Sequence, residues 1–118
     1  MISKLITLID DELYCEVHLR KDASFFFPAE DYYDNDGNYG DLLVRGRRSN
    51  WDTILEIVPL IGEAYTHYLM LTEGIEEPEK PPVIEYYEHW RKGIHWLSTH
   101  GFKIDEAGCY RAMLKRLS

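Results

Sequence analysis

The sequence has few cysteines and no long apolar run, and each absence removes a class of protein. Its two cysteines, Cys15 and Cys109, lie far apart in no metal-ligand spacing, which excludes a disulfide scaffold and a cysteine zinc site. The apolar start of the chain ends at Asp10 and is too short for a secretory signal. The apolar runs also fall far below the roughly 18 residues of a membrane span. We therefore expect a cytoplasmic protein with free thiols and no membrane partner.

Basic side chains are in the minority. The chain has 13 Lys and Arg against 21 Asp and Glu, a formal net charge of −8. Nucleic-acid binding depends on cations that neutralise phosphates, so we do not expect a nucleic-acid partner. Complementary charge speeds association, and the acidity therefore favours a protein partner with a basic surface. The same charge would also serve solubility alone, and the sequence leaves that alternative open.

Catalytic signatures are missing as well. No Gly-x-Ser-x-Gly, His-Glu-x-x-His or Gly-Lys-Ser/Thr motif occurs. A calcium loop centred on Gly37 would use Asp34 and Asp36, but its first and last ligand positions would fall on Tyr32 and Leu43. We therefore expect no cofactor, no bound metal and a non-enzymatic role. Catalysis by paired carboxylates stays open, because the chain has many acids and their geometry is not readable from sequence.

The residues that are present are typical of one small folded domain over residues 1–118. Hydrophobic residues make up 45% and aromatic residues 14% of the chain, more than a disordered chain contains. The first 45 residues are rich in β-branched and aromatic side chains and predict strands. The predicted strands are residues 2–9, 13–20, 24–27 and 41–45. The acidic turn at residues 10–12 would join the first two as an antiparallel hairpin.

Helical periodicity begins after residue 48. Ser49 and Asp52 have capping-box spacing, and apolar residues three and four apart predict a helix over 49–72. Pro59 lies inside this segment and predicts a kink or a break into two helices. Further helices are expected over 83–99 and 105–117. Together these elements indicate an α+β fold: an N-terminal antiparallel sheet of three to four strands followed by two to three helices packed on one face.

The loop before the last predicted strand is the main candidate binding site. Residues 30–41 contain five acids and three tyrosines and no basic residue. Tyrosine is enriched at binding hot spots, and rim acids speed the approach of a basic partner. The predicted contact residues are Asp31, Tyr32, Tyr33, Asp34, Asp36, Tyr39 and Asp41. The sequence therefore favours a non-enzymatic protein-binding module of the inhibitor, immunity or adaptor type. The alternative for the loop is that it only covers the sheet.

A small metal-dependent or carboxylate enzyme is the alternative function. Glu63 and His67 are four residues apart on one predicted helix, and so are Glu85 and His89 on the next. If the two helices opposed these faces, two carboxylates and two imidazoles would surround a divalent metal. The di-iron bundle pattern instead spaces Glu and His by three, which favours two separate surface pairs.

Three further features carry expectations. Cys15 alternates with apolar residues and is expected in the core of a strand. Tyr86 and Trp96 fall off the apolar stripe of their helix, so we expect both to be exposed for recognition. Basic residues gather in two clusters: Arg45, Arg47 and Arg48, and then Arg111, Lys115 and Arg116. The first cluster could hold a phosphate, but pairing with the acidic loop is the simpler account. The second suits the negative end of a helix dipole.

Overall fold

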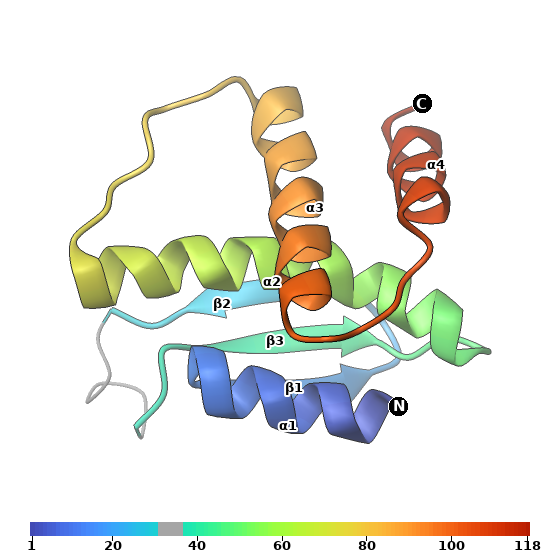
Figure 1. Cartoon of the computed structure of the whole chain (residues 1–118), viewed down its shortest axis with the longest axis horizontal. Helices are drawn as coiled ribbons and strands as arrows, with labels where there is room; N and C mark the ends of the chain where they lie inside the picture. The colour runs from blue at the N-terminus through green and yellow to red at the C-terminus, as the bar shows by residue number, and fades with distance from the viewer. Residues whose placement is uncertain (31–36) are drawn as a thin grey trace.

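The structure, a computed structural model, describes residues 1–30 and 37–118. Within these ranges the chain forms four helices and three strands (Figure 1). In chain order they are α1 Ile2–Leu13, β1 Cys15–Arg20, β2 Phe25–Pro28, β3 Gly40–Arg45, α2 Asn50–Glu73, α3 Pro82–Thr99 and α4 Glu106–Leu117. The α+β class is as expected, while the N-terminal element and the sheet differ from the prediction.

The predicted first strand, residues 2–9, is wrong, because this segment is the helix α1. Its Leu5, Ile9 and Leu13 are spaced by four, so a helix buries all three on one face, and each is at most 1% exposed. The acidic residues 10–12 are its last turn rather than a hairpin turn. Tyr14 ends the helix with a left-handed φ of 54°, and its N–H donates to the Asp10 carbonyl.

The sheet is mixed rather than antiparallel. Its strand order is β1-β3-β2, with β1 parallel and β2 antiparallel to β3. Because residues 2–9 are helical, β1 has no hairpin partner before it and instead pairs with β3 through a crossover. Leu42 and Val44 of β3 are fully buried beneath α2, and Cys15 of β1 is buried beside them, as predicted.

The helix α2 runs without a break from Asn50 to Glu73, so Pro59 does not divide it. Ser49 caps its start as predicted, with the side-chain oxygen accepting from the Asp52 N–H at 3.1 Å. Proline lacks an N–H and therefore leaves the carbonyl four residues earlier without its helical donor. That carbonyl belongs to Leu55, and an Arg116 guanidinium nitrogen from α4 lies 3.5 Å from it. The arginine supplies the donor that Pro59 cannot.

The helices α2 and α3 cross in close contact at two glycines. A Cβ on Gly62 would lie 2.0 Å from the His89 carbonyl oxygen, and one on Gly93 would lie 2.0 Å from that of Val58. The helix α3 also contacts α4, so more than one of its sides is covered. Trp96 is therefore only 5% exposed, and Tyr86 is partly buried against the core, so the expected exposure of this pair is wrong.

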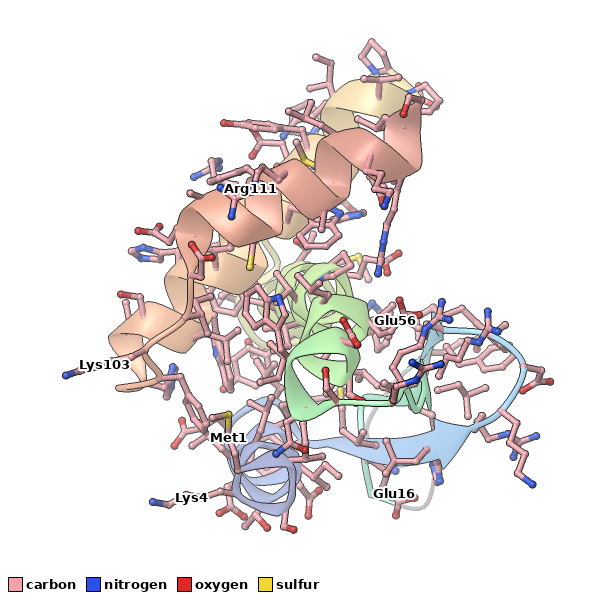
Figure 2. All side chains as sticks on the ribbon, turned by 90° about the vertical axis from the view of Figure 1, so that its right-hand side faces the viewer. Met1, Lys4, Glu16, Glu56, Lys103 and Arg111 are labelled. Atoms are coloured by element: carbon pink, nitrogen blue, oxygen red, sulfur yellow. The ribbon has the colours of Figure 1, made fainter. Side chains whose placement is uncertain are left out.

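The elements form layers. The sheet lies at one end of the molecule, α2 packs on one face of it, and α3 and α4 lie beyond α2 (Figures 1 and 2). The helix α1 packs against β1 and also contacts α2. In the described part of the chain, no helix is both long and apolar enough to cross a membrane.

Candidate functional site

The face of the sheet turned away from α2 carries an exposed aromatic pair. Successive strand residues point to opposite faces, so Phe26 packs against the core while Phe25 and Phe27 lie on the other side. Phe25 is 41% and Phe27 52% exposed, and their rings meet edge-to-face with centroids 4.6 Å apart. Water-exposed paired phenylalanines on a sheet face are the kind of apolar feature that binding partners cover.

Acidic residues adjoin these rings on the same face. The register places Phe27 beside Asp41 of β3, and Asp41 beside Glu16 of β1. Figure 2 shows Glu16 pointing away from the helices. His18 lies between the two carboxylates, with its Nε2 atom 3.0 Å from Asp41 and 3.5 Å from Glu16. The surface of β1, β2 and β3 that carries these five side chains, Phe25, Phe27, Glu16, His18 and Asp41, is called the open sheet face below.

The three polar groups of the open sheet face have the atoms that a divalent cation uses. One ligand atom from each of Glu16, His18 and Asp41 lies within 4.8 Å of the other two. Among residues 1–30 and 37–118, no other group of three His, Cys, Asp or Glu side chains meets this distance. Carboxylate oxygens and an imidazole nitrogen suit zinc, manganese or iron. The same contacts are also those of a histidine held between two acids on a protein surface.

The predicted loop site is only partly placed. Asp31, Tyr32, Tyr33, Asp34 and Asp36 lie outside the described residues. Asp41 lies on the open sheet face beside His18. Tyr39 is half-buried, and its ring packs edge-to-face on Tyr14 at 5.7 Å and on Tyr68 at 5.8 Å between centroids. Its N–H also donates to the Tyr14 carbonyl at 2.7 Å, so Tyr39 anchors the chain as it enters β3.

The four residues of the predicted enzyme site line one depression between α2 and α3. Glu63, His67, Glu85 and His89 surround a cavity of about 410 Å³. Burial, together with the nearby Glu85, raises the pKa of Glu63 to about 7. Burial also lowers the pKa of His89, which keeps its imidazole neutral near pH 7. The depression therefore holds a carboxyl group that gains or loses a proton near neutral pH.

These four side chains share a depression without forming a metal-ligand cluster, since their ligand atoms do not gather within 4.8 Å. His67 is already engaged, because its Nε2 atom lies 2.6 Å from the Ala29 carbonyl oxygen. The chemistry that the arrangement offers is therefore proton transfer by Glu63, whose pKa is raised by its burial and by the nearby Glu85.

The thiols are not candidate nucleophiles. Cys15 and Cys109 are both free and fully buried. Burial raises the pKa of Cys15 to about 12 and that of Cys109 to about 11, with nearby carboxylates adding to both shifts. A thiolate is the reactive form, so neither group attacks a substrate at neutral pH.

Sequence analysis missed the two exposed phenylalanines although a signal for them was present. Three consecutive phenylalanines in a strand must put Phe25 and Phe27 on one face and Phe26 on the other. In a sheet covered on one side only, one of these faces is exposed. The raised pKa of Glu63 had no such signal, because it depends on how α3 crosses α2.

Comparison of this chain with protein-family models, with curated proteins and with solved structures gives no match.

Proposed function

We propose that this protein is a non-enzymatic binding module, of the inhibitor, immunity or adaptor type, that takes a basic protein partner on the open sheet face and on the acidic segment joining β2 to β3. The observation that carries the proposal is the exposed Phe25–Phe27 pair beside the carboxylates of Glu16 and Asp41. Aromatic side chains supply the buried anchors of an interface, and acids around them select a basic partner.

The distribution of charge supports a basic partner. Five of the chain's 13 basic side chains line one cavity. It lies where β1 and β3 end and α2 begins, next to the end of α4. The remaining surface is therefore more acidic than the net charge of −8 indicates. Residues 30–41, which precede most of β3 in the chain, contain five acids and no basic residue. Acids gathered beside an apolar surface steer oppositely charged proteins toward it.

Photo-cross-linking in the cells that make the protein tests this proposal. p-Benzoylphenylalanine replaces Phe27 on the open sheet face, and in a control replaces Lys103, an exposed residue after α3. We expect position 27 to cross-link to a protein with a basic surface. Position 103 should not cross-link to that protein. Three outcomes would overturn the proposal: no adduct at position 27, the same adducts at both positions, or an adduct only with a second copy of this chain.

Acid–base catalysis at Glu63 is the second candidate function. The specific observation in its favour is the pKa of about 7 for a carboxyl group that lines a cavity beside His89. A group that titrates near the working pH is suited to act as general acid and general base.

Hydrolysis of chromogenic esters, phosphates and glycosides tests this second candidate. Activity that changes with a midpoint near pH 7, disappears in Glu63→Gln and persists in Glu79→Gln would support catalysis at Glu63. Glu79 is the matched control because it is exposed in the connector between α2 and α3. Equal activity in both variants, or no activity above buffer, would remove the candidate.

A further inference from the structure

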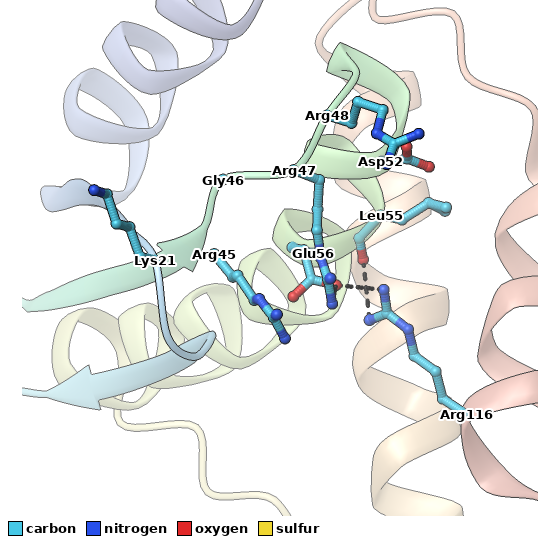
Figure 3. A pocket seen from close by; sticks show the side chains of 9 residues that line it. All are labelled: Lys21, Arg45, Gly46, Arg47, Arg48, Asp52, Leu55, Glu56 and Arg116. Atoms are coloured by element: carbon cyan, nitrogen blue, oxygen red, sulfur yellow. Dashed lines mark hydrogen bonds and ion pairs between the residues drawn. The ribbon is translucent and has the colours of Figure 1, made fainter.

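A cationic cavity lies at the start of α2 in this acidic protein. Its volume is about 550 Å³, within the range of small-molecule sites. Figure 3 shows the side chains that line it and their origin in four separate segments. The five basic residues are Lys21 after β1, Arg45 at the end of β3, Arg47 and Arg48 before α2, and Arg116 in the last turn of α4. Lys21, Arg45 and Arg116 lie far apart in the sequence, so the cavity exists only in the folded protein.

One buried acid holds two of these arginines in place. Glu56 is 6% exposed, and its carboxylate accepts from Arg116 at 2.5 Å and lies 3.8 Å from Arg47. The Ser24 hydroxyl donates to the same carboxylate at 2.7 Å. A buried, fully bonded carboxylate fixes the guanidinium groups around it, so Glu56 gives this side of the cavity a defined shape.

The remaining cations have no such partner. Within residues 1–30 and 37–118, Lys21, Arg45 and Arg48 form no ion pair. The cavity has two acids, Asp52 and Glu56, against five basic residues. Of the predicted cluster Arg45, Arg47 and Arg48, only Arg47 pairs with an acid among the described residues, and that acid is Glu56. The cavity therefore stays positively charged. Like charges gathered without partners repel one another, and a bound anion would remove that repulsion.

We propose that this cavity binds the phosphate groups of a small anionic ligand. Guanidinium groups match phosphate oxygens by paired, parallel hydrogen bonds, and arginine supplies four of the five cations here. The excess of positive charge suits a ligand with more than one phosphate charge. The start of α2 lines the cavity through Asp52, and its positive dipole end adds to the field. A small ligand fits better than a nucleic acid, because the chain's net charge of −8 would repel a long polyanion.

Calorimetric titration with inorganic pyrophosphate, and separately with inorganic phosphate, tests the proposal on the full chain. We expect saturable one-to-one binding that is tighter for pyrophosphate. Arg45→Gln and Lys21→Gln remove cations that hold no partner in the described protein, so each should weaken binding by about tenfold without loss of folding. Arg111→Gln is the matched control, because this exposed arginine lies on α4 outside the cavity (Figure 2), and it should bind within about twofold of wild type.

Circular dichroism and thermal unfolding of each variant show whether it is folded, and Lys21 lies in a loop where its replacement leaves the core intact. Three results would overturn the proposal. The first is no saturable binding of either anion by wild type. The second is an equal loss in Arg111→Gln and in folded Arg45→Gln, which would show general charge attraction. The third is much tighter binding of a single-stranded oligonucleotide than of pyrophosphate, which would make the ligand a nucleic acid.

Discussion

Among the carboxyl groups that the structure describes, Glu63 is the one that folding most clearly holds in its protonated form. Burial against α3, with Glu85 nearby, raises its pKa from the ordinary 4.5 to about 7. Between these two values the folded protein keeps a proton that the unfolded chain has lost. The stability that this proton gives is complete below about pH 4.5 and is lost as the pH rises toward 7.

We therefore predict that Glu63→Gln flattens the pH dependence of stability. In wild type this group lowers the free energy of unfolding by up to about 1.4 kcal/mol per pH unit between pH 5 and 7. A glutamine does not titrate, so the variant should lack that slope, whereas Glu79→Gln should keep it. Urea unfolding at a series of pH values measures both. A Glu63→Gln slope equal to that of wild type would show that this carboxyl group has an ordinary pKa.

The two cysteines lead to a second prediction at the residue scale. Because burial raises the pKa of both thiols, Cys15 and Cys109 should not react with Ellman's reagent in the native protein at pH 8. Both should react within seconds once urea unfolds the chain. Rapid labelling of one thiol in the native protein would mean that its part of the core opens readily.

At the scale of elements, the sequence was most informative where a pattern had one physical interpretation. The capping residue Ser49 and the three- and four-residue apolar spacing after it predicted a helix over 49–72, close to the observed α2. Residues 2–9 had two interpretations. Their isoleucines favour a strand, whereas Leu5, Ile9 and Leu13 fit a helix only if the turn at 10–12 is read as helical. A strand at residues 2–9 would have paired with β1 in a hairpin. Because these residues form a helix, β1 pairs with β3 instead.

Packing between helices decided what periodicity could not. The expectation for Trp96 assumed that α3 buries a single stripe, but α3 packs closely enough on α2 to bury the tryptophan as well. The same crossing brings Glu63, Glu85 and His89 around one cavity. The spacing within each Glu–His pair was visible in sequence, whereas their meeting required the angle and distance of two helices.

The crossing gives an element-scale prediction. Gly93→Ala would place a methyl group 2.0 Å from the Val58 backbone oxygen, and backbone cannot move aside as a side chain can. We expect the free energy of unfolding to fall by more than about 2 kcal/mol. Ser98→Ala, on an exposed position of the same helix, is the control and should be nearly neutral. Chemical denaturation of both variants measures the difference. A Gly93→Ala protein as stable as wild type would show that the helices lie further apart.

At the scale of the whole molecule, charge is unevenly distributed. The counts of acidic and basic residues predicted an acidic protein. It did not predict that five cations would gather in one cavity while acids adjoin two exposed phenylalanines on the open sheet face. Lys21, Arg45 and Arg116 lie far apart in the chain, and only the fold brings them together. The two surfaces carry the two proposals, a protein partner on one and a phosphate-bearing ligand on the other.

The most direct test of the binding proposal is the association and dissociation kinetics of the partner cross-linked at position 27, measured on purified proteins at several salt concentrations. Phe27→Ala removes an exposed anchor and should raise the dissociation rate by a factor that corresponds to about 1–3 kcal/mol. Glu16→Gln removes an exposed rim charge and should lower the association rate at low salt, with the difference disappearing as salt is added. Tyr39→Ala should lower folding stability and leave the affinity per folded molecule unchanged, because Tyr39 packs on Tyr14 and Tyr68. If folded Phe27→Ala and Glu16→Gln both bind the partner with wild-type rates at every salt concentration, the open sheet face is not the interface.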